Sequence, residues 1–183
     1  MNRILLDMDG VLSDFISGAC SVHSKSDPYE GGCNLGDYDI AALLEMTPGD
    51  FWLPMGKDFW ASLPPFPEAF ELVAFLESLF GQENICILSS PNLNPESMQG
   101  KLEWIERHFP KYRRQYLFGP RKQFCAGLGH ILIDDHDVNV QVFNDAGGVG
   151  VLYPRPWNSR HGLSRVQSLE HVMHSVLSRR VVL

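Results

Sequence analysis

Three short apolar segments that each end in polar residues restrict the fold of this chain more than any other feature of its sequence. Runs of this length, closed by residues that favour turns, are typical of strands buried on both faces of a sheet. The segments and their polar ends are residues 4–6 before Asp7 and Asp9, residues 85–88 before Ser89 and Ser90, and residues 131–133 before Asp134 and Asp135. In a parallel sheet the carboxyl ends of the strands lie along one edge, where open α/β sheets bind ligands. The sequence therefore predicts one polar site at one sheet edge.

Helical patterns alternate with these strands along the chain. Apolar residues recur at helical spacing over residues 67–81, 96–109, 138–143 and 166–177, and further strand-like segments cover residues 116–118 and 149–152. Strands that alternate with helices form a parallel sheet with helices on both faces and right-handed crossovers. The predicted fold class is therefore α/β, with a three-layer, Rossmann-like parallel sheet.

The segment between the first and second strands does not follow this rhythm. A helix is expected over residues 11–24, followed by a loop rich in Pro, Gly, Asn and Asp over residues 27–36 and then by an aromatic-rich stretch broken by prolines. We therefore expect residues 1–15 and 65–183 to form the α/β core. Residues 16–64 are expected to form a small, mainly helical cap inserted after the first strand.

The composition argues against several classes of partner. The net charge of −7 leaves no basic face for a nucleic-acid polymer. No apolar run approaches the roughly 20 residues needed to span a bilayer, so no membrane partner is expected. Cys20, Cys33, Cys86 and Cys125 show no C-x-x-C spacing, which favours a reduced, cytoplasmic protein. The expected partner is a small molecule, and the sequence does not decide whether the chain forms a homodimer.

Four of the polar residues at the strand ends are carboxylates. Asp7 and Asp9 can face one pocket because alternate side chains of an extended strand point the same way. Asp134 and Asp135 would join them at the same sheet edge. Carboxylates this close repel one another unless a cation or a shared proton lies between them. An oxygen-rich site of this kind suits Mg²⁺, which binds carboxylates, water and phosphate oxygens.

Hydroxyl and ammonium groups would complete such a site. Ser89 and Ser90 lie where a strand meets a turn, and their hydroxyls with the turn N–H groups can hold phosphate oxygens. A lysine would balance the remaining negative charge, and both Lys101 and Lys122 are candidates.

The order of these motifs resembles that of the haloacid dehalogenase (HAD) superfamily of phosphatases, and most closely its 5'(3')-deoxyribonucleotidase branch. The similar stretches are residues 7–15 (DMDGVLSDF), Ser89-Ser90-Pro91, residues 132–135 (LIDD) and residues 101–106 (KLEWIE). The matches are spread over about residues 3 to 136. The cap matches weakly, and the chain after residue 140 barely at all.

The resemblance implies a role for each acidic residue. Asp7 would be the nucleophile that attacks phosphorus and forms an aspartyl-phosphate, and Asp9 would be the general acid and base. Asp7, the backbone carbonyl of Asp9 and Asp135 would hold Mg²⁺. Asp134 would either bind the metal through a water molecule or hold the groups that bind the metal directly.

The resemblance also implies the phosphate-binding groups and the activity. Ser89 and Ser90 would bind phosphate; Lys122 aligns best with the family's lysine, and Lys101 is the alternative. The implied activity is Mg²⁺-dependent hydrolysis of (deoxy)ribonucleoside 5'-monophosphates. A phosphatase of another small phosphate ester, such as a sugar phosphate, and a non-catalytic domain that binds a phosphorylated ligand are the alternatives.

The aromatic residues of the cap are candidates for binding a nucleobase. The resemblance places Phe15 in contact with substrate, and Trp52 and Trp60 offer flat apolar surfaces on which a base can stack. The alternative is that these rings form the core of the cap. Residues 153–165, rich in Pro, Arg and Asn, form a loop that could reach the edge of the site, whereas Arg179 and Arg180 are expected to be exposed.

Overall fold

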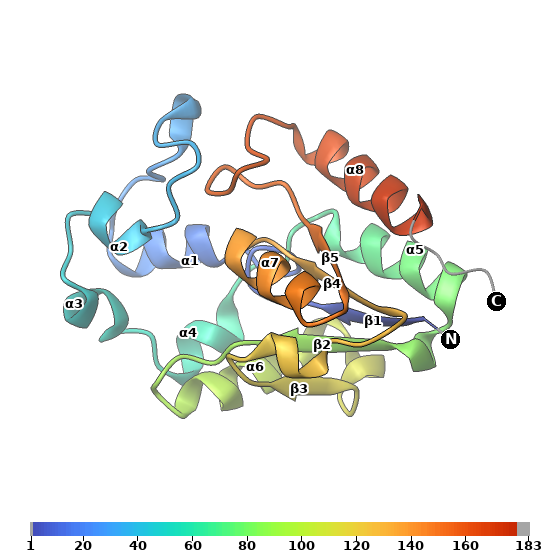
Figure 1. Ribbon diagram of the computed structural model, residues 1–183. Helices are drawn as coiled ribbons and strands as arrows, with labels where there is room; N and C mark the ends of the chain where they lie inside the picture. Colours follow the sequence, from blue (N-terminus) through green and yellow to red (C-terminus); the bar gives the residue numbers. More distant parts are fainter. Residues whose placement is uncertain (1, 179–183) are drawn as a thin grey trace.

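A five-stranded parallel sheet forms the centre of the protein, as a computed structural model describing residues 2–178 shows (Figure 1). The strands lie in the order β3-β2-β1-β4-β5. Their bounds are β1 (Arg3–Leu6), β2 (Ile85–Ser89), β3 (Tyr116–Phe118), β4 (His130–Asp134) and β5 (Val149–Leu152). The predicted α/β fold class with a parallel sheet is confirmed. The expectation for Arg179 and Arg180 lies outside the described residues.

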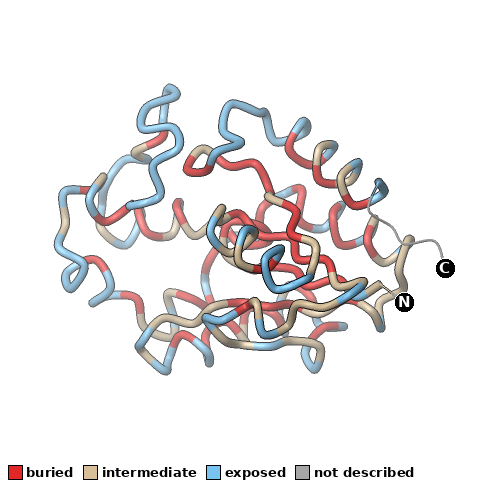
Figure 2. Tube along the Cα trace, viewed as in Figure 1, coloured by how far each residue is buried: buried red, intermediate tan, exposed pale blue. Residues whose placement is uncertain are grey.

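Helices cover both faces of this sheet. One face packs against α5 (Ala69–Phe80), α6 (Glu96–His108) and α8 (Arg165–Ser178), and the other packs against α7 (Asp137–Asp145). The alternation of side chains along the strands separates the two cores: Ile4 and Leu6 face the first set of helices, whereas Leu5 faces α7. The central strands β1, β2 and β4 are therefore largely buried on both faces, which explains their continuous apolar runs, whereas the edge strand β3 is partly exposed (Figure 2).

The sequence located the regular elements of the core well. Each of its strands and helices lies within two residues of its predicted bounds, because its apolar face or flanking breakers mark both ends. Residues 2–178 also contain four short 3₁₀ helices: η1 (Glu30–Gly32), η2 (Gln82–Asn84), η3 (Pro110–Tyr112) and η4 (Lys122–Cys125). No described helix is long and apolar enough to cross a membrane.

The inserted segment consists of short helices beyond the carboxyl ends of the strands (Figure 1). They are α1 (Phe15–Val22), α2 (Ile40–Leu43), α3 (Pro48–Trp52) and α4 (Lys57–Ser62). The prediction of a helix from residue 11 was wrong at its start. The Met8 carbonyl accepts the backbone N–H groups of Val11, Leu12 and Ser13 in a tight turn, and the Asp14 side chain then caps α1.

The last helix of the insertion packs closely against the core helix α6. Gly100 allows this contact, because a Cβ atom there would lie 2.3 Å from the Lys57 carbonyl oxygen. The indole of Trp104 donates to the Leu63 carbonyl at 2.7 Å, and the guanidinium of Arg107 donates to the Ala61 carbonyl at 2.8 Å. Helix α4 is thus held firmly against α6, with Trp60 beside Lys101.

Candidate active site

The three polar strand ends predicted from the sequence meet at one edge of the sheet. Asp7 follows β1 directly, Ser89 ends β2, and Asp134 ends β4. The register pairs Leu6 with both Ile87 and Ile133, so the three strands finish at nearly the same level. Parallel pairing therefore brings together residues that are far apart in the sequence.

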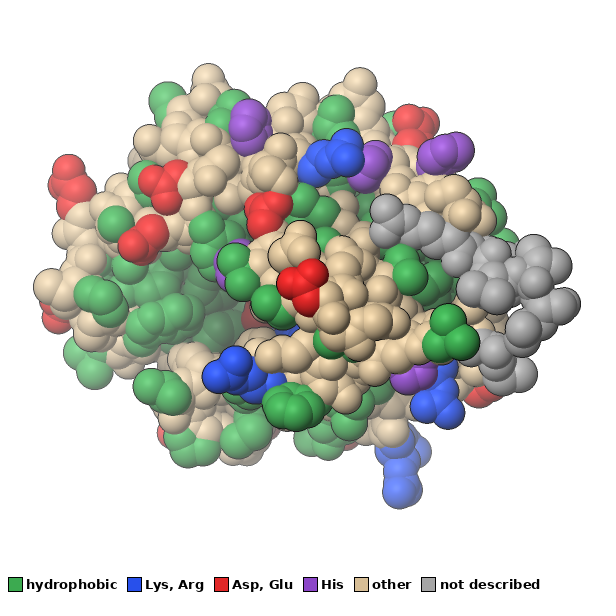
Figure 3. All heavy atoms as spheres, viewed as in Figure 1, with side chains coloured by type: hydrophobic (Ala, Val, Ile, Leu, Met, Phe, Trp, Pro, Cys, Tyr) green, Lys and Arg blue, Asp and Glu red, His purple; other side chains and the backbone are tan. Residues whose placement is uncertain are grey.

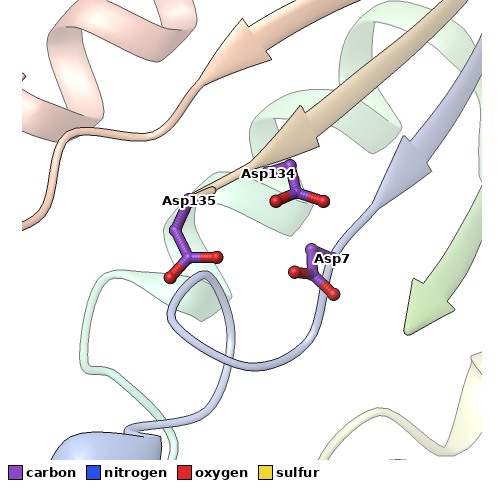
Figure 4. A group of neighbouring side chains, drawn as sticks. All are labelled: Asp7, Asp134 and Asp135. Atoms are coloured by element: carbon purple, nitrogen blue, oxygen red, sulfur yellow. The ribbon is translucent and has the colours of Figure 1, made fainter. Parts of the chain in front are cut away.

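Three carboxylates form a compact cluster at this edge. Asp7, Asp134 and Asp135 are all buried, and each offers an oxygen atom that lies within 4.8 Å of the others (Figure 4). Gly10 makes room for the cluster: its φ of +77° is strained for other residues, and a Cβ atom there would lie 2.0 Å from Asp135 Oδ2. Among the described residues, this is the one group of His, Cys, Asp and Glu side chains arranged to hold a metal ion.

Lys122 is the cation in contact with this cluster. Its ammonium nitrogen lies 2.7 Å from Asp7 Oδ1 and 2.6 Å from Asp134 Oδ2, and its side chain is 1% exposed. Asp134 also accepts hydrogen bonds from the His136 backbone and from the Asn139 side chain. Both oxygens of Asp134 are therefore engaged by the protein.

The charge of the cluster is not balanced by Lys122 alone. Three ionised carboxylates and one ammonium leave an excess of two negative charges. Burial raises the pKa of Asp7 to about 7, against the opposing effect of Lys122, and burial also raises the pKa of Asp135 well above its ordinary value. Burial alone would lower the pKa of Lys122, but the carboxylates of Asp7 and Asp134 outweigh it and raise that pKa. Such a cluster is stabilised by a proton or a hard cation, so the residues present fit Mg²⁺.

Asp9 belongs to a second charged group beside the first. Its carboxylate forms an ion pair with Lys101 and accepts a hydrogen bond from Ser13 Oγ at 3.1 Å. Lys101 comes from α6, is fully buried, and donates to Ser89 Oγ at 3.0 Å. The sequence left Lys101 and Lys122 as alternatives, and the structure places both at the site with different partners.

A cavity of about 820 Å³ opens above the carboxylates. Asp7, Asp9, Lys122, Asp135 and Ser90 line its polar end. The structure places Ser89, Lys101 and Asp134 outside this lining. Lys101 contacts Asp9 and Asp134 contacts Lys122, both of which line the cavity, whereas Ser89 contacts Lys101. The rest of the wall is largely apolar, and Figure 3 shows a hollow on this face bordered by hydrophobic side chains.

The three aromatic residues predicted to bind substrate all line the cavity. The Phe15 ring stacks on the Trp60 ring at 5.6 Å and lies 5.9 Å from the Trp52 ring. Trp60 is 2% exposed and donates its indole N–H to the Met55 carbonyl, whereas Trp52 is 41% exposed. Trp60 thus forms part of the core of the insertion, and Trp52 presents the accessible surface.

The loop after β5 reaches the site, as expected for residues 153–165, and supplies site residues that the sequence did not single out. Trp157 donates its indole N–H to Asp135 Oδ2 at 2.6 Å, and Asn158 donates to the Asp135 carbonyl at 2.8 Å. Arg155 is buried beneath the turn that contains Gly10. Their position directly after a strand that ends at the same sheet edge was the available signal.

Comparisons with known proteins show which family this chain resembles. The sequence profile of the family described as "5' nucleotidase, deoxy (Pyrimidine), cytosolic type C protein" matches residues 1–182. A 5'(3')-deoxyribonucleotidase of Bacillus subtilis is 24% identical over 178 residues, with 95% of this chain and 98% of the relative covered. A provisionally named 5'(3')-deoxyribonucleotidase of Bordetella bronchiseptica is 33% identical over 143 residues, with 74% of each chain covered.

A solved structure shows the same fold. The L-2-haloacid dehalogenase of Xanthobacter autotrophicus has a TM-score of 0.53 at 14% identity, with 100% of this chain and 84% of that chain covered. The chain belongs to the type C 5'-nucleotidase family, within the haloacid dehalogenase superfamily, which confirms the resemblance seen in its motifs. It is therefore an enzyme of the phosphoric monoester hydrolase class.

Proposed function

We propose that this enzyme hydrolyses (deoxy)ribonucleoside 5'-monophosphates in a Mg²⁺-dependent reaction that passes through an aspartyl-phosphate on Asp7. The observation that carries the proposal is the position of the buried carboxylate cluster at the end of an aromatic-lined cavity. The cavity has room for a nucleotide, with charged groups at one end and flat apolar rings on its wall. The names of the two nucleotidase relatives support the same substrate class.

Asp7 is suited to the role of nucleophile. It lines the cavity at the end of a rigid strand, and its Oδ1 is held by Lys122 and by the backbone N–H of Met8, both at 2.7 Å. In the first step an Asp7 oxygen forms a bond to phosphorus while the bond between phosphorus and the ester oxygen breaks. Lys122 offsets the negative charge carried by the phosphoryl group.

Asp9 is placed to move the proton in both steps. In its protonated form it gives the proton to the leaving ester oxygen. As a carboxylate it then accepts a proton from the water that attacks the aspartyl-phosphate, which releases inorganic phosphate and restores Asp7. Lys101 and Ser13 fix the orientation of Asp9, and Ser89 fixes Lys101 in turn.

Mg²⁺ would be held by the carboxylates of Asp7 and Asp135 and by the backbone carbonyl of Asp9. When bound, it supplies positive charge that polarises the phosphoryl group. Asp134 supports this arrangement by pairing with the ammonium group of Lys122, which also contacts Asp7. Ser90 lines the cavity where a phosphate oxygen would lie. The base would stack on Trp52, beside Phe15 and Trp60.

Two further predictions stay with this proposal. A cytoplasmic location is supported by the four cysteines, all of which are free in the structure. The second prediction is that the enzyme forms a homodimer.

The proposal is tested by measuring phosphate release from a panel of ribo- and deoxyribonucleoside monophosphates and sugar phosphates, with Mg²⁺ and with EDTA. We expect Mg²⁺-dependent turnover that is fastest with nucleoside 5'-monophosphates. A preference for sugar phosphates would replace the substrate and leave the chemistry intact. Binding of phosphorylated ligands without turnover would favour a non-catalytic domain instead.

A further inference from the structure

The segment of residues 153–158, called the strap below, connects the carboxylate cluster to the insertion. It leaves the sheet after β5, where the Tyr153 backbone N–H donates to the Asp134 carbonyl at 2.8 Å. Farther along, the Pro156 carbonyl accepts the backbone N–H of Gly36, also at 2.8 Å. The strap therefore forms backbone hydrogen bonds with both the core and the insertion.

Arg155 attaches the strap to the loop that carries Asp9. This buried guanidinium donates to the Gly10 carbonyl, pairs with Glu68 at 2.9 Å, and lies 3.7 Å from the centre of the Phe66 ring. A buried ion pair that also binds backbone carbonyls holds its surroundings rigidly, because breaking it would leave a charge without a partner. The hydrogen bond from Arg155 to the Gly10 carbonyl thereby restrains the loop after β1.

Trp157 attaches the strap to Asp135. The indole is 7% exposed, its N–H group lies 2.6 Å from Asp135 Oδ2, and its ring lies 5.6 Å from the ring of Tyr29 in the insertion. Asn158 holds the Asp135 backbone by donating to its carbonyl. Figure 4 shows one Asp135 oxygen directed toward Asp7 and Asp134 and the other directed away.

We infer that Trp157 is a positioning residue that sets the orientation of the Asp135 carboxylate for the cation, an inference that rests on the proposed function. A carboxylate oxygen that accepts an N–H bond cannot rotate freely, so the second oxygen stays aimed at the cluster. Groups that orient metal ligands in this way change metal affinity by about 10- to 100-fold when they are removed. Trp157 also lines the cavity, but this role depends on its N–H group and not on its ring.

Trp157→Phe separates these two properties, because phenylalanine keeps an aromatic ring and cannot donate. We expect the Mg²⁺ dissociation constant, measured by calorimetry on the full chain without substrate, to rise by about 10- to 100-fold. The nucleotide KM at saturating Mg²⁺ should change less than about threefold. Trp104→Phe is the matched control, since it removes an indole hydrogen bond of 2.7 Å to the Leu63 carbonyl outside the site, and it should leave the Mg²⁺ dissociation constant unchanged.

The indole N–H signals of the wild-type protein in NMR spectra provide a second measurement that does not depend on how the variants fold. Added Mg²⁺ should shift the Trp157 signal and leave the Trp104 signal in place. Equal Mg²⁺ affinity of wild type and Trp157→Phe, or an unmoved Trp157 signal in a protein that binds Mg²⁺, would overturn the role of Trp157. Absence of Mg²⁺ binding by the wild type would instead overturn the proposed function, and this inference with it.

Discussion

The ammonium nitrogen of Lys122 lies 2.7 Å from Asp7 Oδ1, inside the carboxylate cluster at the sheet edge. The same nitrogen lies 2.6 Å from Asp134, so one cation connects the proposed nucleophile to a buried acid behind it. This contact holds Asp7 at the floor of the cavity and supplies charge where a phosphoryl group would bind.

Lys122→Met should reduce turnover by at least about 100-fold, because it removes a preorganised positive charge at the site of phosphoryl transfer. It should also lower the free energy of unfolding at pH 8 by about 3–5 kcal/mol, since Asp7 and Asp134 lose their buried partner. Lys111→Met is the control: this lysine is 63% exposed and pairs with Glu77 at the surface, so its loss should cost less than about 1 kcal/mol. Near-normal turnover in Lys122→Met would contradict the assigned role.

The metal-free protein should become less stable as pH rises from about 4 to 7. Burial raises the pKa of Asp7 from 3.8 to about 7, so the folded state holds this proton more tightly than the unfolded state does. Stability is therefore lost as Asp7 ionises, and Mg²⁺ should restore more of it at pH 8 than at pH 5. Urea denaturation with EDTA and with Mg²⁺ at both pH values measures this. A Mg²⁺ effect that is equal at both pH values would argue against a cation bound by Asp7.

Gly10→Ala should abolish Mg²⁺ binding and turnover, because its Cβ atom would collide with Asp135 Oδ2 and its φ is +77°. Gly147→Ala separates collision from backbone strain. Gly147 has a φ of +89° with open space around it, so the substitution should cost about 1–3 kcal/mol of stability and leave Mg²⁺ binding intact. Thermal unfolding and Mg²⁺ calorimetry on both variants distinguish the two effects. If Gly10→Ala binds Mg²⁺ normally, the cation does not use Asp135.

Trp52→Ala should raise the KM for nucleoside monophosphates by about 10-fold, the loss expected when a stacking surface is removed. Hydrolysis of ribose 5-phosphate, which has no base, should be nearly unaffected. Leu53→Ala, at the neighbouring position that is 83% exposed, serves as the control with unchanged kinetics for both substrates. An equal loss with both substrates would show that Trp52 supports the fold of the insertion and does not bind a base.

The sequence was sufficient to predict the sheet and the residues at its edge. The apolar runs before Asp7, Ser89 and Asp134 fix the strands, and parallel pairing then brings the polar ends together without further information. Lys122 could be proposed because it aligns with the family's lysine, twelve residues before Asp134.

Contacts made by irregular segments could not be predicted in the same way. Trp157 reaches Asp135 through a loop without periodicity, and the ion pair between Lys101 and Asp9 joins a residue of α6 to one 92 positions earlier in the loop after β1. The rings of Trp52 and Trp60 differ in exposure although both lie in one aromatic-rich stretch, since their orientation depends on how the short helices pack. Tertiary packing, and not local pattern, decides each of these positions.

The most direct test of the central claim is phosphate release from thymidine 5'-monophosphate by the wild-type protein and Asp7→Asn, each assayed with Mg²⁺ and with EDTA. Circular dichroism of both proteins checks that they are folded. We predict turnover by the wild type with Mg²⁺ alone, and a loss of at least about 1,000-fold in Asp7→Asn. Turnover by the wild type in EDTA, or by Asp7→Asn with Mg²⁺, would contradict a metal-dependent reaction in which Asp7 is the nucleophile.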